Sequence, residues 1–295
     1  MNLFVISGQQ INLSNMESTG NIAWNYLLKG LALSATQLGL VFGPFILLAL
    51  IMHLVSKKNE TLSVKLMGRT VYLCLFGWLG ISVHELGHAL FALIFGHRIN
   101  KINFISPHPE EGSMGYVDHS YNPGNIYHQI GNFFIGIGPI LLGTFLLYLL
   151  SMLLFDVNLF KDQATVWTTG SLSLSSLKTI LVDTSQEVLD YLKAIWTAEK
   201  SSWGKMMLLG YALYSIGSSI SLSRSDLRIA WKGFLIIALI VLVFNLATQW
   251  IADFSAETVV TIAQSISAFC AILMLSIAIN LVFMGIILLF HALKK

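Results

Sequence analysis

Long apolar stretches dominate the pattern of hydrophobic and polar positions along the chain. A bilayer core of about 30 Å requires about 20 mostly apolar residues in a helix. Six stretches approach or exceed that length, and we expect each to form a transmembrane helix: 31–55, 70–96, 128–155, 204–222, 233–252 and 258–292. The fourth is the weakest and is rich in Gly and Ser, while the sixth is too long for one upright crossing. The pattern predicts an all-α polytopic membrane protein that forms one membrane-embedded domain over residues 1–295.

Two polar stretches interrupt the apolar ones. Residues 97–127 contain Pro and Gly among short β-favouring pieces such as 102–105, which predicts a β-hairpin or small sheet. Residues 156–203 form a mixed polar connection, and within it residues 177–196 carry apolar positions at helical spacing. We expect that part to be an amphipathic helix on the membrane surface.

The composition agrees with a membrane protein. Of the 295 residues, 55% are hydrophobic and 11% are charged, whereas a soluble domain carries about 45–50% apolar and about 25% charged residues. A soluble enzyme domain is therefore excluded, and a net charge of only +2 argues against a nucleic-acid partner. Cys74 and Cys270 both lie in apolar runs and make neither a disulfide framework nor a thiolate zinc site. We expect a multi-pass protein of the cell membrane.

The basic residues do not give one consistent orientation for six spans. Those within 57–69 argue that the first connection is cytoplasmic. Those within 224–232 and at 294–295 argue the same for the connection after the fourth span and for the C-terminus. Six alternating spans cannot satisfy both, so either one span is miscounted or the rule does not hold for this chain.

One motif whose residues could bind a metal ion and catalyse a reaction lies inside the second predicted span. The chain reads His84-Glu85-Leu86-Gly87-His88, and residues four apart share a helix face, so the two imidazoles can ligate one metal ion. Glu85 can take a proton from a metal-bound water. Ionisable residues at the centre of a transmembrane helix cost about 2.5–3.5 kcal/mol each, so they are usually functional. The motif predicts a catalytic site with one Zn²⁺ per chain, which needs a third protein ligand and an open position.

The stretch from about 78 to 145 resembles the site-2 protease family of intramembrane zinc metalloproteases, in the compact branch that lacks an inserted extracytoplasmic domain. The resemblance rests on the motif helix, on Gly96-His97-Arg98-Ile99, on the β-like stretch with Gly112 and Gly115, and on a returning helix with Gly138-Pro139. It implies that His84 and His88 are zinc ligands and that Glu85 is the catalytic general base. It also implies that the β-like element at 97–127 receives an unwound substrate as an added strand.

The third zinc ligand is the point at which the chain departs from that family. The family takes it from an Asp in a Leu-Asp-Gly motif on a later transmembrane helix, and no such motif occurs here. The best candidate is Asp226, at the end of the fourth predicted span. The alternative for Asp226 is an interfacial charge paired with Arg224 or Arg228. Glu187 is the main rival ligand, because soluble zinc peptidases often draw a Glu from a later helix.

Other polar residues are weaker candidates. Asn132, on the third predicted span, is a candidate substrate-binding residue that could hydrogen-bond a substrate carbonyl or an oxyanion. A contact between helices is the competing interpretation. His108, His119 and His128 are expected at the surface, where one of them could line the entrance to the site.

The sequence thus predicts a zinc metalloendopeptidase, a hydrolase whose partners are the lipid bilayer and a transmembrane protein or peptide substrate. One alternative is a non-proteolytic metal-binding membrane transporter or sensor with a peptidase-like fold. Another is a membrane hydrolase that acts on a non-protein amide or ester, because the zinc chemistry would be the same.

Overall fold

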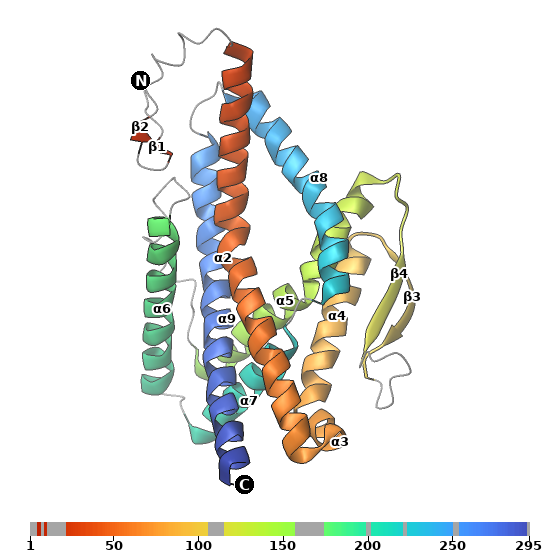
Figure 1. Ribbon diagram of the computed structural model, residues 1–295, viewed down its shortest axis with the longest axis vertical. Helices are drawn as coiled ribbons and strands as arrows, with labels where there is room; N and C mark the ends of the chain where they lie inside the picture. The colour runs from red at the N-terminus through yellow and green to blue at the C-terminus, as the bar shows by residue number, and fades with distance from the viewer. Residues whose placement is uncertain are drawn as a thin grey trace.

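Two long helices set the length of the molecule. The computed structural model describes residues 5–6, 9–10, 22–105, 115–156, 174–198, 202–220, 223–249 and 254–293. Helix α2 (Ile22–Met67) and helix α9 (Phe254–Leu293) pack against each other and lie side by side along the longest axis (Figure 1). The end of α9 lies at the same end of the molecule as the turn that follows α2 (Figure 1).

The remaining elements follow in chain order between these two helices. They are α3 (Arg69–Tyr72), a π-helical turn η1 (Leu73–Gly77), α4 (Trp78–Ile94), α5 (Ile126–Phe155), α6 (Leu174–Thr197), α7 (Trp203–Ser219) and α8 (Arg224–Thr248). Two antiparallel pairs of strands complete the list, β1 (Val5–Ile6) with β2 (Gln9–Gln10) and β3 (Arg98–Asn103) with β4 (Tyr116–Ser120).

Five helical segments of the described chain are long and apolar enough to cross a membrane. They are Val41–Met67, Arg69–Ile94, Ile126–Phe155, Arg224–Thr248 and Phe269–Leu293. The predicted fourth span, 204–222, is not among them. It corresponds to α7, whose 17 residues extend over about 26 Å, less than the thickness of a bilayer core. In Figure 1, α7 lies in the lower part of the molecule and α8 begins near mid-height.

Five crossings remove one conflict in the charge pattern. With five, the connection after the first span and the C-terminus lie on the same side, whereas six would separate them. Figure 1 agrees, because the α2–α3 connection and the end of α9 lie at one end.

Helix α8 begins nine residues earlier than the predicted span 233–252. The reason is a capping box, in which the Ser223 hydroxyl accepts the Asp226 N–H and the Asp226 carboxylate accepts the Ser223 N–H. The expectation that Asp226 lies at the end of the fourth span is therefore wrong: Asp226 is in the first turn of α8.

The two polar stretches fold largely as their patterns indicate. Strands β3 and β4 form the expected hairpin, with Ile99 opposite His119 and an irregularity between Ile99 and Lys101. The amphipathic segment is helical as α6, but it runs alongside α9 and contacts it (Figure 1). Tyr191 and Ile195 of α6 are buried in the protein core, whereas Leu189 and Trp196 are exposed, so only part of its apolar side faces protein.

Helices α4, α5 and α8 approach closely because small residues lie where they meet. A Cβ added at Gly87 of α4 would lie 2.7 Å from the Pro139 backbone of α5. A Cβ added at Gly136 of α5 would lie 2.7 Å from the Asp226 carbonyl oxygen of α8. Real Cβ atoms do not come this close to backbone atoms, so any larger residue at either position would push the helices apart. These contacts bring the motif helix α4 and the first turn of α8 close against α5.

Candidate metal centre

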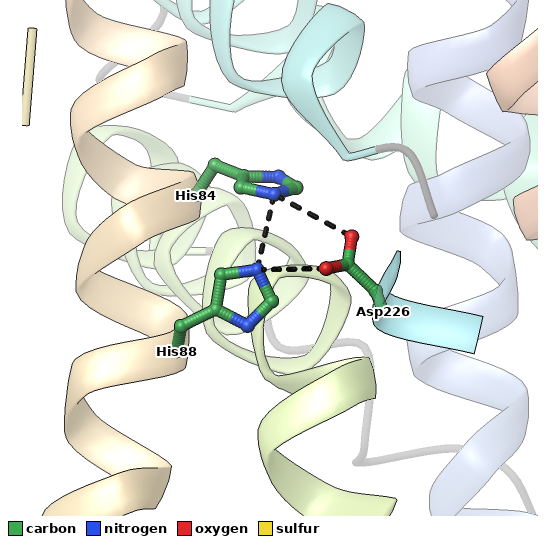
Figure 2. A group of neighbouring side chains, drawn as sticks. All are labelled: His84, His88 and Asp226. Atoms are coloured by element: carbon green, nitrogen blue, oxygen red, sulfur yellow. Dashed lines mark hydrogen bonds and ion pairs between the residues drawn. The ribbon is translucent and has the colours of Figure 1, made fainter. Parts of the chain in front are cut away.

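Three side chains from two helices converge on one another. His84 and His88 extend from successive turns of α4, and Asp226 extends toward them from the first turn of α8 (Figure 2). The two Nε2 atoms are 3.2 Å apart. Asp226 Oδ1 is 3.5 Å from His88 Nε2, and Asp226 Oδ2 is 3.9 Å from His84 Nε2. Tetrahedral bonds of 2.0–2.1 Å separate neighbouring ligand atoms by about 3.3 Å, so this group could hold a metal ion.

The hydrogen bonds of the two imidazoles fix which ring nitrogen is bare. His84 Nδ1 is 2.7 Å from the Ser219 carbonyl oxygen, and His88 Nδ1 is 2.8 Å from the Ile135 carbonyl oxygen. A carbonyl can only accept, so each Nδ1 carries the proton and each neutral ring presents an unprotonated Nε2. An N–H donated to a backbone carbonyl is the usual support of a metal-ligating histidine. The two rings are thus prepared to bind a cation between them.

Both carbonyls are available because their usual helical partners are absent. In an α-helix the Ile135 carbonyl would accept the N–H of residue 139, but Pro139 has no N–H. Ser219 is the last residue of α7. The N–H four residues on, that of Ser223, is donated to Asp226 Oδ2 over 2.8 Å. One proline and one helix end therefore orient the two histidines.

Glu85 follows His84 directly on α4, is buried, and lies within electrostatic range of Asp226. Its side chain contacts the segment that enters β4, because a Cβ added at Gly115 would lie 2.7 Å from Glu85 Cγ and 3.0 Å from Glu85 Oε1. The β3–β4 hairpin therefore passes directly over the carboxylate that the motif provides.

Asn132 lies on α5, one helical turn before Ile135, whose carbonyl supports His88. It is only 2% exposed. Its Oδ1 atom is buried and has no hydrogen-bond partner among the residues that the structure describes. A buried amide oxygen without a partner is costly, so packing between helices alone leaves this acceptor unsatisfied.

Glu187, the rival third ligand, lies on α6. Within the described parts of the chain, the group of three metal-binding side chains that the structure brings together contains Asp226 and not Glu187. The group that could hold a metal ion thus contains the predicted histidine pair and the preferred carboxylate, which lies in the first turn of α8 and not at the end of the fourth predicted span. The sequence did not identify Pro139, Ser219 or Ile135 as supports, because a backbone acceptor leaves no signature in side-chain chemistry.

Comparisons with protein-family models, with curated proteins and with solved structures find no match to this chain. Arguments about its function therefore depend on the chain itself.

We predict that Asp226→Asn loses the metal and that Glu187→Gln does not. The asparagine keeps an oxygen that can accept the Ser223 N–H, so α8 still begins at its cap, but the charged ligand is gone. Metal analysis of the purified proteins should give Asp226→Asn one zinc equivalent fewer than the wild type. Loss of that equivalent in Glu187→Gln instead would assign the third ligand to α6.

We predict that Pro139→Ala weakens zinc binding by about 10–100-fold, the usual effect of losing a group that supports a ligand. The new N–H at position 139 competes for the Ile135 carbonyl and leaves His88 Nδ1 without its acceptor. Zinc titration against a competing chelator measures the change. Pro44→Ala, in the interior of α2, is the matched control and should bind zinc as the wild type does. Equal affinities for all three proteins would show that Pro139 has no such role.

Proposed function

We propose that this protein is an intramembrane zinc metalloprotease of the site-2 protease kind. In the cell membrane it cleaves peptide bonds in or near transmembrane segments of other membrane proteins. One observation carries the proposal: two bare imidazole nitrogens and a carboxylate converge beside Glu85, inside a chain with five membrane-length apolar helices.

The donor set supports zinc as the ion. Two histidines and one carboxylate are the ligands of many catalytic zinc sites, which keep a fourth position for water or substrate. His84, His88 and Asp226 would hold the zinc ion, which would supply a Lewis acid for the scissile carbonyl and would lower the pKa of water from 15.7 to about 7.

Glu85 is the general base in this proposal. It follows His84 directly on α4 and would act on water bound to an ion that His84 held. Glu85 takes the proton of the attacking water and later gives it to the leaving amine. Its burial under the Gly115 segment limits the access of bulk water to the same carboxylate.

The hairpin provides a place for an extended substrate. A helical peptide engages its carbonyls in hydrogen bonds, so a transmembrane substrate must unwind before hydrolysis. The β3–β4 sheet has only two strands, so each strand has one edge that no other strand of this sheet pairs. An unwound segment that pairs with such an edge presents its backbone near Glu85.

Asn132 completes the proposed machinery as a substrate-binding residue. Its amide is buried on α5, one helical turn before Ile135, whose carbonyl supports His88. An amide N–H directed at a developing oxyanion stabilises the transition state more than the ground state.

A metal-binding transporter or sensor with this fold would have no use for Glu85 as a base, so Glu85 argues against it. A hydrolase of a non-protein amide would use the same residues as the protease. Substrate experiments separate the three functions.

We predict that Glu85→Gln abolishes hydrolysis while the bound zinc remains. The amide cannot accept the proton, yet the ligands are unchanged. Purified protein in lipid vesicles is incubated with single-span peptides that carry helix-breaking residues, and mass spectrometry maps the products. Glu60→Gln, a carboxylate change in the first span, is the control and should cleave normally. Cleavage by Glu85→Gln would rule out this mechanism, and a wild type that cleaves none of these peptides would count against proteolysis.

We predict that Asn132→Ala lowers kcat by about 10²–10³-fold with little change in KM, as the loss of an oxyanion donor does. Steady-state kinetics on a cleaved peptide, together with zinc content and thermal unfolding, measure the effect. An unchanged kcat with a lowered Tm would instead identify Asn132 as a structural contact between helices.

A further inference from the structure

A second pair of histidines lies where the motif helix meets the hairpin. His97 directly precedes β3, and His119 lies on β4. Their Nδ1 atoms are 3.1 Å apart, nearly the separation of the two Nε2 atoms at the metal centre. The sequence pattern places His119 at the surface and gives His97 no function.

His97 is held rigidly in place. Gly96 adopts a left-handed conformation with φ of 71°, and the His97 N–H bonds the Ala92 carbonyl over 2.8 Å, which ends α4 in a Schellman motif. The ring is buried, with only 3% of the residue exposed. It stacks on Tyr121 with 4.9 Å between ring centroids.

The hydrogen bonds around His97 leave its Nδ1 unprotonated, so it can accept a hydrogen bond from His119 Nδ1 or bind a cation in place of that proton. His97 Nε2 is 2.8 Å from the His128 carbonyl oxygen, so Nε2 carries the proton in the neutral ring. As at His84 and His88, one ring N–H is donated to a backbone carbonyl. At His97 the donor is Nε2 and the unprotonated atom is Nδ1. The His128 ring is occupied differently, because its Nδ1 accepts the Asn122 N–H over 3.2 Å, which leaves the proton of the neutral ring on Nε2. His128 thus orients His97 through its backbone and offers no bare nitrogen.

We propose that His97 Nδ1 and His119 Nδ1 bind a second divalent cation of the zinc class, with water completing its coordination. Two imidazole nitrogens at this separation suit a late first-row metal ion, for which imidazole is a preferred ligand. The His97 N–H donated to a backbone carbonyl gives one of the rings the support expected of a metal ligand.

The second ion would connect the hairpin to the end of the motif helix. His119 is on β4, and the segment that enters β4 at Gly115 lies against Glu85. A cation shared by His97 and His119 therefore fastens the strand that covers Glu85 to the helix that carries Glu85. This site does not depend on the proposed proteolysis, because its test is metal binding.

The test is zinc stoichiometry of the full chain by equilibrium dialysis in detergent. We expect two zinc equivalents for the wild type and one for His119→Gln. We also expect one for the double variant His84→Gln/His88→Gln, and none when His119→Gln is added to it. His291→Gln, at the end of α9, is the matched control and should bind two. A wild type that binds one equivalent, which His119→Gln retains, overturns the second site.

A second measurement guards against misfolding of the variants. In the His84→Gln/His88→Gln protein, zinc should slow amide hydrogen exchange in Tyr116–Ser120, because the ion holds β4 to α4. The same addition should change nothing once His119→Gln is also present. Exchange in β4 that zinc does not slow in the double variant contradicts the proposal, whatever the protein does to peptides.

Discussion

Two hydrogen bonds to backbone carbonyls are the interactions on which the candidate metal centre depends. They keep the protons of His84 and His88 on Nδ1 and direct both bare Nε2 atoms toward Asp226. Each acceptor is free for a physical reason, since Pro139 lacks an N–H and the Ser223 N–H is donated to Asp226. Asp226 therefore acts twice, as a member of the donor group and as the carboxylate of the capping box that starts α8.

The break between α7 and α8 explains how a carboxylate reaches the middle of an apolar molecule. Helix α7 is too short to cross a bilayer, and α8 begins near mid-height (Figure 1). A helix N-terminus favours a negatively charged side chain in its first turn, so Asp226 is stabilised at a depth where an isolated charge would be costly. Gly136 then allows this turn to rest against α5.

Local patterns allowed part of the fold to be predicted. Helical periodicity alone predicts that His84 and His88 share one helix face. Turn chemistry alone predicts a hairpin in the Pro- and Gly-bounded stretch at 97–127. The start of α8 could not be predicted from apolar content, because its first turn is polar and is stabilised by a cap. The carbonyls that support His84 and His88 lie 135 and 47 residues away in the chain. Every residue has a backbone carbonyl, so the residue type does not show which one accepts. The pairing of His97 with His119 likewise appears only once the hairpin register is known.

The position of bound zinc tests the central claim most directly. Crystals or ordered membrane arrays of the protein grown with zinc, measured on both sides of the zinc absorption edge, locate the ion by anomalous scattering. The account predicts a peak within bonding distance of His84 Nε2, His88 Nε2 and one Asp226 oxygen, with Glu85 beside it. No peak at these three donors, in a protein whose His84 and His88 still donate to Ser219 and Ile135, would contradict it.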